Sequence, residues 1–118
     1  MKLKDSTVIV NQNIYTDTIK AIVDRVYKTY GLEATCTSGN DGVHGKNSYH
    51  GKDRALDIRF WDILDKVAES IRRNLPPYYD DVVEKDHFHI EADAKKEALW
   101  ISKTSNTSTA DSTGSKTN

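Results

Sequence analysis

The stretch HFHIEAD, residues 87–93, decides how the C-terminal half of the chain folds, because its side chains alternate in character. In an extended segment, alternate positions fall on opposite faces: His87, His89 and Glu91 on one, Phe88, Ile90 and Ala92 on the other. The apolar face has to pack onto a core, so the polar face points away from it. The sequence therefore predicts a half-buried strand that presents two imidazoles on its outer surface.

Three further strands follow from the same reasoning. Residues 79–84, YDDVVE, form a strand candidate that a two-residue turn joins to residues 87–93, as in a hairpin. Residues 55–60, ALDIRF, alternate as well and place Asp57 on their polar face. Residues 32–37 add another strand. If residues 55–60 lie beside residues 87–93, Asp57 points to the same surface as the histidines.

Two amphipathic helices flank these strands. Residues 16–30 repeat apolar side chains every three to four positions, with Thr16 as the expected N-cap and Gly31 in the left-handed position that ends a helix. Residues 61–75 show the same spacing and stop at a Pro-Pro pair. Residues 95–101 form a last helical turn. We therefore expect an α+β fold, in which a small antiparallel sheet is flanked by two amphipathic helices.

Composition bounds the class of protein. The chain has 118 residues, which allows one small domain, and its last segment, residues 102–118, is too rich in Ser and Thr to bury a core. We expect a folded body over residues 1–101 and a disordered C-terminal tail. The net charge of −1 does not favour nucleic acid as a partner, and the apolar runs are too short for a membrane span or a signal peptide. The single Cys36 is expected as a buried free thiol, and the body as a monomer.

The polar surface of the predicted sheet has the composition of a metal site. His50 precedes Asp57 by seven residues across a glycine-containing loop, and strand parity lets both converge with His89. Two imidazoles and one carboxylate suit Zn²⁺ and leave a fourth position for water. The alternative is that each histidine is a surface or hydrogen-bonded structural residue.

Two motifs carry a resemblance to a known family. Residues 48–57, SYHGKDRALD, resemble the S-x-H-x-x-G-x-A-x-D motif of zinc peptidases of the D-Ala-D-Ala carboxypeptidase and L-alanyl-D-glutamate peptidase type, which are related to the hedgehog signalling domain. Residues 86–89, DHFH, resemble the second motif, in which an acidic residue precedes the last zinc ligand by three. Residues 37–39, TSG, are similar to the strand end that opens the family's site loop. The resemblance spans residues 32–93 and implies the hedgehog/DD-peptidase fold.

Carried over position by position, the resemblance implies that His50, Asp57 and His89 bind zinc. Asp86 is then the general base, and it has to lie at the hairpin turn, because residues three apart do not share a strand face. Ser48 stands where the family's serine hydrogen-bonds substrate; its alternative role is to cap a turn in the loop. Two other acids compete with Asp86 for the role of base: Glu84 and Glu91.

Two more histidines are candidates for the site. The sequence from His87 to His89 also resembles the H-x-H of lysostaphin-type endopeptidases, in which the first histidine acts in catalysis and the second binds zinc. His87 is thus a candidate transition-state stabiliser, or a residue that orients Asp86. His44 is a candidate substrate-binding group, with a solvated loop histidine as the alternative.

The sequence departs from the family pattern at two places. The motif's glycine is replaced by Asp53, a residue type that tolerates the left-handed conformation better than most. Asn40 and Asp41 follow the Ser-Gly pair, where many members carry an arginine that holds a substrate carboxylate. Three other basic residues are candidates to replace that arginine: Lys46, Arg54 and Arg59.

The resemblance implies a zinc peptidase that cuts D-amino-acid-containing peptides of peptidoglycan. A chain this short, with no separate wall-binding module, suits a phage-type endolysin or a small cell-wall remodelling enzyme that acts after release or delivery. The alternatives are a zinc-stabilised, hedgehog-like binding module without catalysis, a lysostaphin-type endopeptidase, and a nuclease of the His-metal type. The nuclease lacks a downstream Asn and His on a helix and a basic surface for phosphate.

Overall fold

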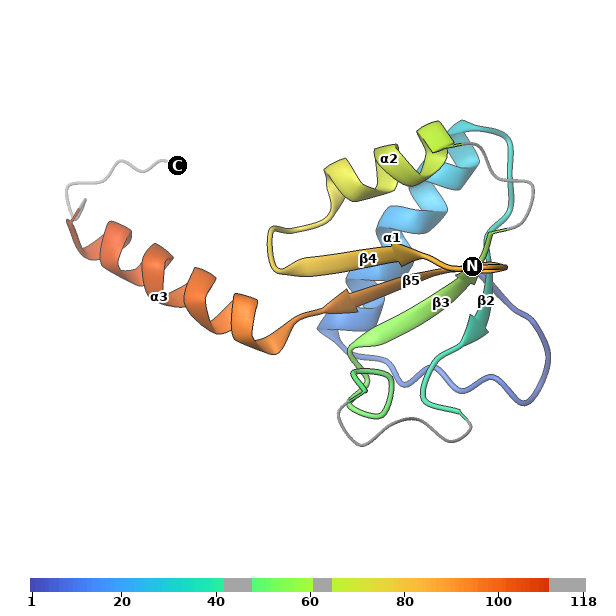
Figure 1. Ribbon diagram of the computed structural model, residues 1–118, viewed down its shortest axis with the longest axis horizontal. Helices are drawn as coiled ribbons and strands as arrows, with labels where there is room; N and C mark the ends of the chain where they lie inside the picture. Colours follow the sequence, from blue (N-terminus) through green and yellow to red (C-terminus); the bar gives the residue numbers. More distant parts are fainter. Residues whose placement is uncertain (42–47, 61–64, 111–118) are drawn as a thin grey trace.

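The structure is a computed structural model that describes residues 1–41, 48–60 and 65–110. Its elements, in chain order, are β1 (Lys2–Leu3), α1 (Ile14–Thr29), β2 (Thr35–Ser38), β3 (Ala55–Arg59), α2 (Asp65–Asn74), β4 (Tyr79–Val83), β5 (His87–Ala92) and α3 (Ala94–Ala110). The strands form one sheet in the order β1-β2-β3-β5-β4 (Figure 1). This arrangement confirms the α+β class and the hairpin of β4 and β5.

The sheet is mixed, which corrects the expected antiparallel sheet. The pairs β2–β3, β3–β5 and β5–β4 are antiparallel, as expected, but β1 pairs with β2 in parallel. The backbone N–H groups of Lys2 and Lys4 donate to the carbonyls of Ala34 and Cys36 at 3.0 and 2.9 Å. A strand of two exposed residues carries no alternating pattern, so the sequence contained no signal for it.

Helix α1 begins earlier than Thr16. Its N-cap is Asn13, whose side-chain oxygen accepts from the backbone N–H groups of Tyr15 and Thr16 at 2.8 and 3.0 Å. Thr16 is buried in the first turn instead, and its hydroxyl donates to the Asn11 carbonyl. Both residue types cap helices well, and only the tertiary contacts decide between them. Gly31 follows the helix with φ of +73°, as predicted.

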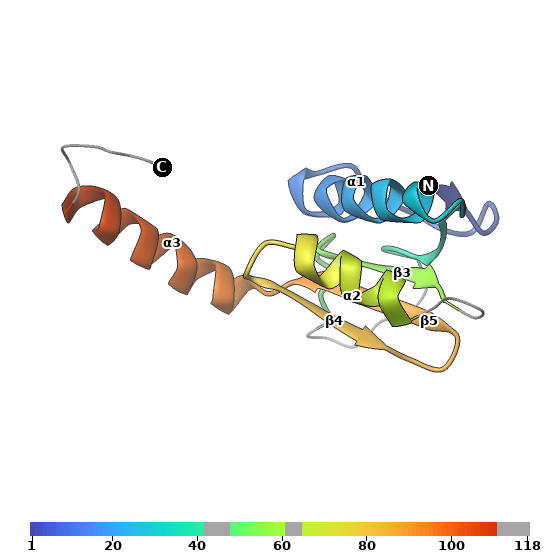
Figure 2. The same ribbon diagram turned by 90° about the horizontal axis from the view of Figure 1, so that it is seen from above.

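The two helices α1 and α2 lie on the same side of the sheet, as Figure 2 shows. Helix α2 covers most of the predicted range 61–75, of which residues 61–64 lie outside the described part. The core between the helices and the sheet contains the apolar faces of β3 and β5. Its largest fully buried side chains include Tyr27, Phe88, Ile19, Leu56, Ile58, Ile71 and Ile90. The polar faces of β3 and β5 therefore lie on the side of the sheet without these helices.

Helix α3 is longer than the turn expected over residues 95–101. It begins after Asp93, whose carboxylate accepts from Lys96 N–H at 2.9 Å, and it extends away from the sheet (Figures 1 and 2). The helix includes residues 102–110 of the segment predicted to be disordered, and residues 111–118 lie outside the described part. Once a helix is nucleated, each further residue adds one hydrogen bond, so polar residues can continue it. None of the described helices combines the length and apolarity that a membrane crossing needs.

Candidate metal centre

Strand register brings Asp57 and His89 together. Asp57 of β3 stands directly opposite His89 of β5 in the antiparallel ladder, and neighbouring side chains in such a pair lie on the same face. The prediction that these strands are neighbours and share a polar face is thus confirmed. Cys36 of β2, on the other side of β3, is fully buried and free, also as predicted.

The turn before β3 positions the side chain of His50 beside Asp57 and His89. Within it, the Arg54 and Lys52 N–H groups donate to the Tyr49 carbonyl, and Ser48 Oγ accepts from His50 N–H at 3.2 Å. The turn closes at Asp53, whose φ of +57° is left-handed. Asp53 thus adopts, at the position of the family's glycine, the left-handed conformation that its residue type tolerates.

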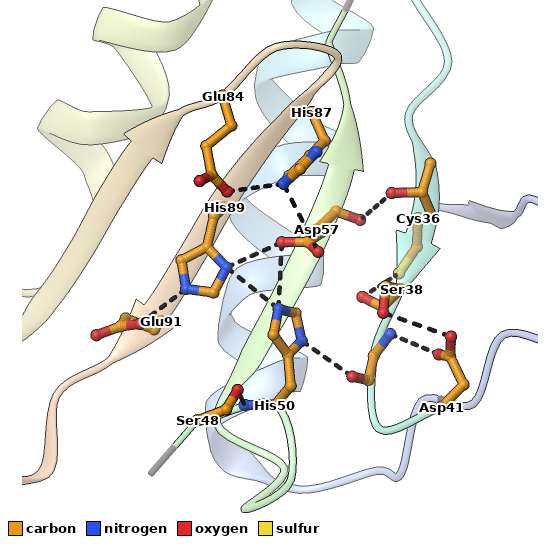
Figure 3. A network of polar contacts seen from close by, with 12 residues as sticks. Cys36, Ser38, Asp41, Ser48, His50, Asp57, Glu84, His87, His89 and Glu91 are labelled. Atoms are coloured by element: carbon orange, nitrogen blue, oxygen red, sulfur yellow. Dashed lines mark hydrogen bonds and ion pairs between the residues drawn. The ribbon is translucent and has the colours of Figure 1, made fainter. Parts of the chain in front are cut away.

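Three side chains converge at this point (Figure 3). His50 Nε2 lies 3.2 Å from Asp57 Oδ1 and 3.2 Å from His89 Nδ1, and His89 Nδ1 lies 2.9 Å from Asp57 Oδ1. The exposed fractions of the side chains are 7% for His50, 14% for Asp57 and 18% for His89. The group is therefore largely sheltered from water but remains accessible from one side.

The spacing of these atoms fits a zinc ion. Ligands at Zn–N and Zn–O distances of about 2.0–2.1 Å and tetrahedral angles lie about 3.3 Å from one another. The three observed separations, 2.9 to 3.2 Å, are slightly shorter, so small side-chain movements suffice to hold the ion. Catalytic zinc sites pair three protein ligands with a water molecule, and the partial exposure of Asp57 and His89 is compatible with such a fourth ligand.

The hydrogen bonds on the outer side of each imidazole determine which nitrogen faces inward. His50 Nδ1 lies 2.9 Å from the carbonyl oxygen of Gly39, and His89 Nε2 lies 2.7 Å from Glu91 Oε1. Carbonyl and carboxylate oxygens only accept, so both of these ring nitrogens donate. In neutral rings, His50 Nε2 and His89 Nδ1 then carry lone pairs directed at the Asp57 carboxylate, an arrangement that a cation stabilises.

The electrostatics of the group are consistent with this need for positive charge. Burial alone would raise the pKa of the Asp57 carboxyl, but hydrogen bonds from His50 and His89 hold it well below its usual range. The hydrogen bond with Asp57 raises the pKa of His89 to about 9, against the opposing effect of burial. In the absence of metal, the proton on His89 supplies the positive charge that Asp57 requires.

Asp86 and His87 lie beside this group rather than within it. Asp86 precedes β5 at the hairpin turn, as predicted, and its exposed carboxylate accepts from His87 Nδ1 at 2.9 Å. His87 Nε2 donates to Glu84 at 2.8 Å and lies 3.9 Å from Asp57 Oδ2. Both ring nitrogens face carboxylates, and these partners raise the pKa of His87 despite the lowering effect of burial. His87 thus connects Asp86 to the edge of the site.

The other expected site residues divide into four cases. Ser48 caps the His50 turn through its hydroxyl, which is the alternative role considered for it. Arg54 is held by Glu97 at 2.8 Å and by the Ala92 carbonyl, so it supports α3 rather than a ligand. Arg59 stands opposite His87 in the ladder. His44 and Lys46 lie outside the described residues.

Glu91 and the Gly39 carbonyl were not recognised as supports of the candidate metal site. Glu91 was considered as a general base, but it bonds the outer nitrogen of His89. Its position two residues after His89, on the same strand face, was the available signal. No sequence pattern could predict the contact of the Gly39 carbonyl, because a backbone group is positioned by the fold alone.

A second acidic group lies farther along the same face. Asp80, Glu91 and Asp93 bring carboxylate oxygens together, but the Lys96 ammonium forms an ion pair with Asp80. Lysine thus already supplies positive charge there. Among the described residues, the group of His50, Asp57 and His89 is the better donor set for a transition metal, since it contains nitrogen ligands.

Comparisons with protein-family models, curated proteins and solved structures find no match for this chain.

Proposed function

We propose that this chain is a zinc-dependent peptidase of the D-Ala-D-Ala carboxypeptidase type, with the related hedgehog-like fold, that hydrolyses stem peptides of peptidoglycan. The observation that carries the proposal is the convergence of His50 Nε2, Asp57 Oδ1 and His89 Nδ1 within 3.2 Å of one another, with both outer ring nitrogens hydrogen-bonded. The order and spacing of the two sequence motifs support the family.

In this proposal His50, Asp57 and His89 hold the ion. Zinc, when bound, polarises a scissile carbonyl and lowers the pKa of a bound water toward about 7. Gly39 and Glu91 fix the ring orientations of the two histidines, so the ligands are arranged before the ion arrives.

Proton transfer is assigned to Asp86. Its carboxylate is exposed at the turn beside the site and, like an ordinary aspartate, is ionised at neutral pH; the hydrogen bond from His87 lowers its pKa further. It is therefore free to accept a proton and to deliver it to a leaving amine. His87 lies near Asp57, and its carboxylate neighbours raise its pKa, so its protonated ring is the candidate positive charge for a developing oxyanion.

The proposal is tested by zinc content and hydrolysis. The purified chain is expected to contain about one zinc per molecule and to release new amino groups from purified peptidoglycan. His89→Ala should lose the metal and the activity, whereas Asp86→Asn should keep the metal and lose about 10²-fold or more in kcat. Glu69→Gln, an exposed acid on α2, is the matched control and should change neither. A chain that binds no zinc with its three ligands intact contradicts the proposal.

A second candidate is a zinc-stabilised binding module without catalysis. It is favoured by one observation: among the described residues, the Asp86 carboxylate bonds His87 rather than any of the three candidate ligands. In such a module, zinc removal would lower the free energy of unfolding, but peptidoglycan would bind without cleavage. Full zinc occupancy together with no amine release from any stem peptide would favour this candidate.

A further inference from the structure

Asp41 occupies the region where the family resemblance expects a substrate-binding arginine. Its Oδ1 accepts from two backbone N–H groups, those of Gly39 at 2.8 Å and Ile9 at 3.0 Å, and its Oδ2 lies 3.4 Å from the Ser38 hydroxyl. Although burial opposes it, these backbone hydrogen bonds hold the pKa of Asp41 below its usual range. The carboxylate thus joins the N-terminal segment to the loop that follows β2 (Figure 3 shows its bonds to that loop).

The peptide after Gly39 is held in one orientation by the same segment. The Asn40 N–H donates to the Ile9 carbonyl at 2.7 Å. In a trans peptide the C=O and N–H groups point in opposite directions, so this bond turns the Gly39 carbonyl away from Ile9. The packing is tight, because a Cβ on Gly39 would clash with the Ile9 carbonyl oxygen.

The Gly39 carbonyl, oriented in this way, accepts from His50 Nδ1 at 2.9 Å (Figure 3). We propose that Asp41 is a positioning residue for the metal centre: by joining Ile9 to Gly39 it fixes the carbonyl that holds His50 with Nε2 directed at Asp57. The identification of the bound ion as zinc rests on the proposed function, whereas the fixed orientation of His50 does not depend on it.

Three variants separate this role from a general loss of stability. Asp41→Ala removes the acceptor for both N–H groups. Asp41→Asn keeps a carbonyl oxygen at the position of Oδ1, and Asp41→Glu keeps the charge but displaces the oxygen by one methylene. The matched control is Asp5→Ala, which removes an exposed carboxylate that likewise accepts a backbone N–H, from Thr7 at 2.9 Å, without a hydrogen bond to Gly39.

The first measurement uses the metal-free chain labelled with ¹⁵N-histidine. The Nδ1 proton of His50, assigned with His50→Gln, should be protected from solvent exchange in the wild type, in Asp41→Asn and in Asp5→Ala. It should exchange rapidly in Asp41→Ala and Asp41→Glu. If Asp41→Ala does not fold, the exchange rates of the Nδ1 proton in Asp41→Asn and Asp41→Glu are compared instead. Protection that persists in Asp41→Glu, or in a folded Asp41→Ala, overturns the proposal whether or not the chain binds zinc.

The second measurement is zinc affinity by competition with a chelator. Loss of an outer hydrogen-bond partner typically weakens metal binding by 10- to 100-fold. Because Asp41 acts through Gly39, we expect about a tenfold loss in Asp41→Ala and recovery to nearly wild-type affinity in Asp41→Asn. Equal affinities in Asp41→Ala and Asp41→Asn would refute a positioning role. Failure of the wild type to bind zinc contradicts the proposed function and leaves the exchange measurement to decide on Asp41.

Discussion

Zinc affinity is expected to rise steeply with pH, because the metal has to displace a proton. The nitrogen of His89 that faces Asp57 is Nδ1, and its hydrogen bond with Asp57 raises the pKa of His89 to about 9. At pH 7 only about one molecule in a hundred has this nitrogen free, so the apparent affinity should increase about tenfold per pH unit between 7 and 9. The gain over the whole interval is about a hundredfold. Asp57 does not add to this slope, because its pKa lies far below the interval.

Calorimetric titration of the metal-free chain with Zn²⁺ measures the displaced proton directly. Titrations at pH 7.5 in two buffers of different ionisation enthalpy should give about one proton released per zinc bound. The pKa of His87 is also raised, so His87→Gln serves as the control and should release the same number. Zinc binding that releases no proton and does not vary with pH would refute the assignment of His89 Nδ1 as a ligand.

The free energy of unfolding of the metal-free chain should fall as the pH rises, opposite to the zinc affinity. The pKa of His89 is higher in the folded state than the unfolded value of about 6.5. The stabilisation from this proton is therefore complete below pH 6.5 and is lost as the pH rises through 9. Urea unfolding with a chelator present should show a falling midpoint over this interval, and His89→Gln should reduce that fall and leave the part that the raised pKa of His87 contributes. A midpoint that rises between pH 6.5 and 9 would contradict the raised pKa.

Three further predictions concern the body of the fold. Phe88→Ala should lower the free energy of unfolding by about 3–5 kcal/mol in urea titrations, since Phe88 is fully buried and its ring packs 5.0 Å from that of Phe60; a loss below about 1 kcal/mol would contradict this core. Asn13→Ala should cost about 1 kcal/mol through loss of the α1 cap, whereas Lys20→Ala, at an exposed position of the same helix, should cost less. Burial raises the pKa of the Cys36 thiol to about 12, so it should react with a thiol reagent only as fast as the chain unfolds; rapid reaction of the native chain would refute its burial.

Local sequence patterns predicted the strands and helices that surround the site. Alternation in ALDIRF and HFHIEAD is a property of the residues themselves, and the buried faces of β3 and β5 follow it. Gly31 and Asp53 were recognised because a left-handed backbone restricts the residue types that occupy it. The short parallel strand β1 and the cap at Asn13 were not predicted, because neither depends on a periodic pattern.

The candidate ligands were also predicted, but the groups that hydrogen-bond the outer ring nitrogens of the two histidines were not. His50, Asp57 and His89 have side chains with metal-binding chemistry, so spacing and parity were enough to select them. The Gly39 carbonyl is common to every residue type, and its orientation depends on Ile9, which is 30 positions away in the chain. No local pattern encodes such a contact.

The sequence by itself determined which residues alternate, which cap and which carry imidazole or carboxylate groups, because these are properties of single side chains and of their spacing. Tertiary structure alone decided that Asp57 stands opposite His89, and that the outer nitrogens of His50 and His89 are both hydrogen-bonded. It also decided that Asp41 joins Ile9 to the loop beside His50. The physical reason is that a hydrogen bond within about 3 Å depends on strand register and backbone orientation, and these are set by the packing of segments far apart in the chain.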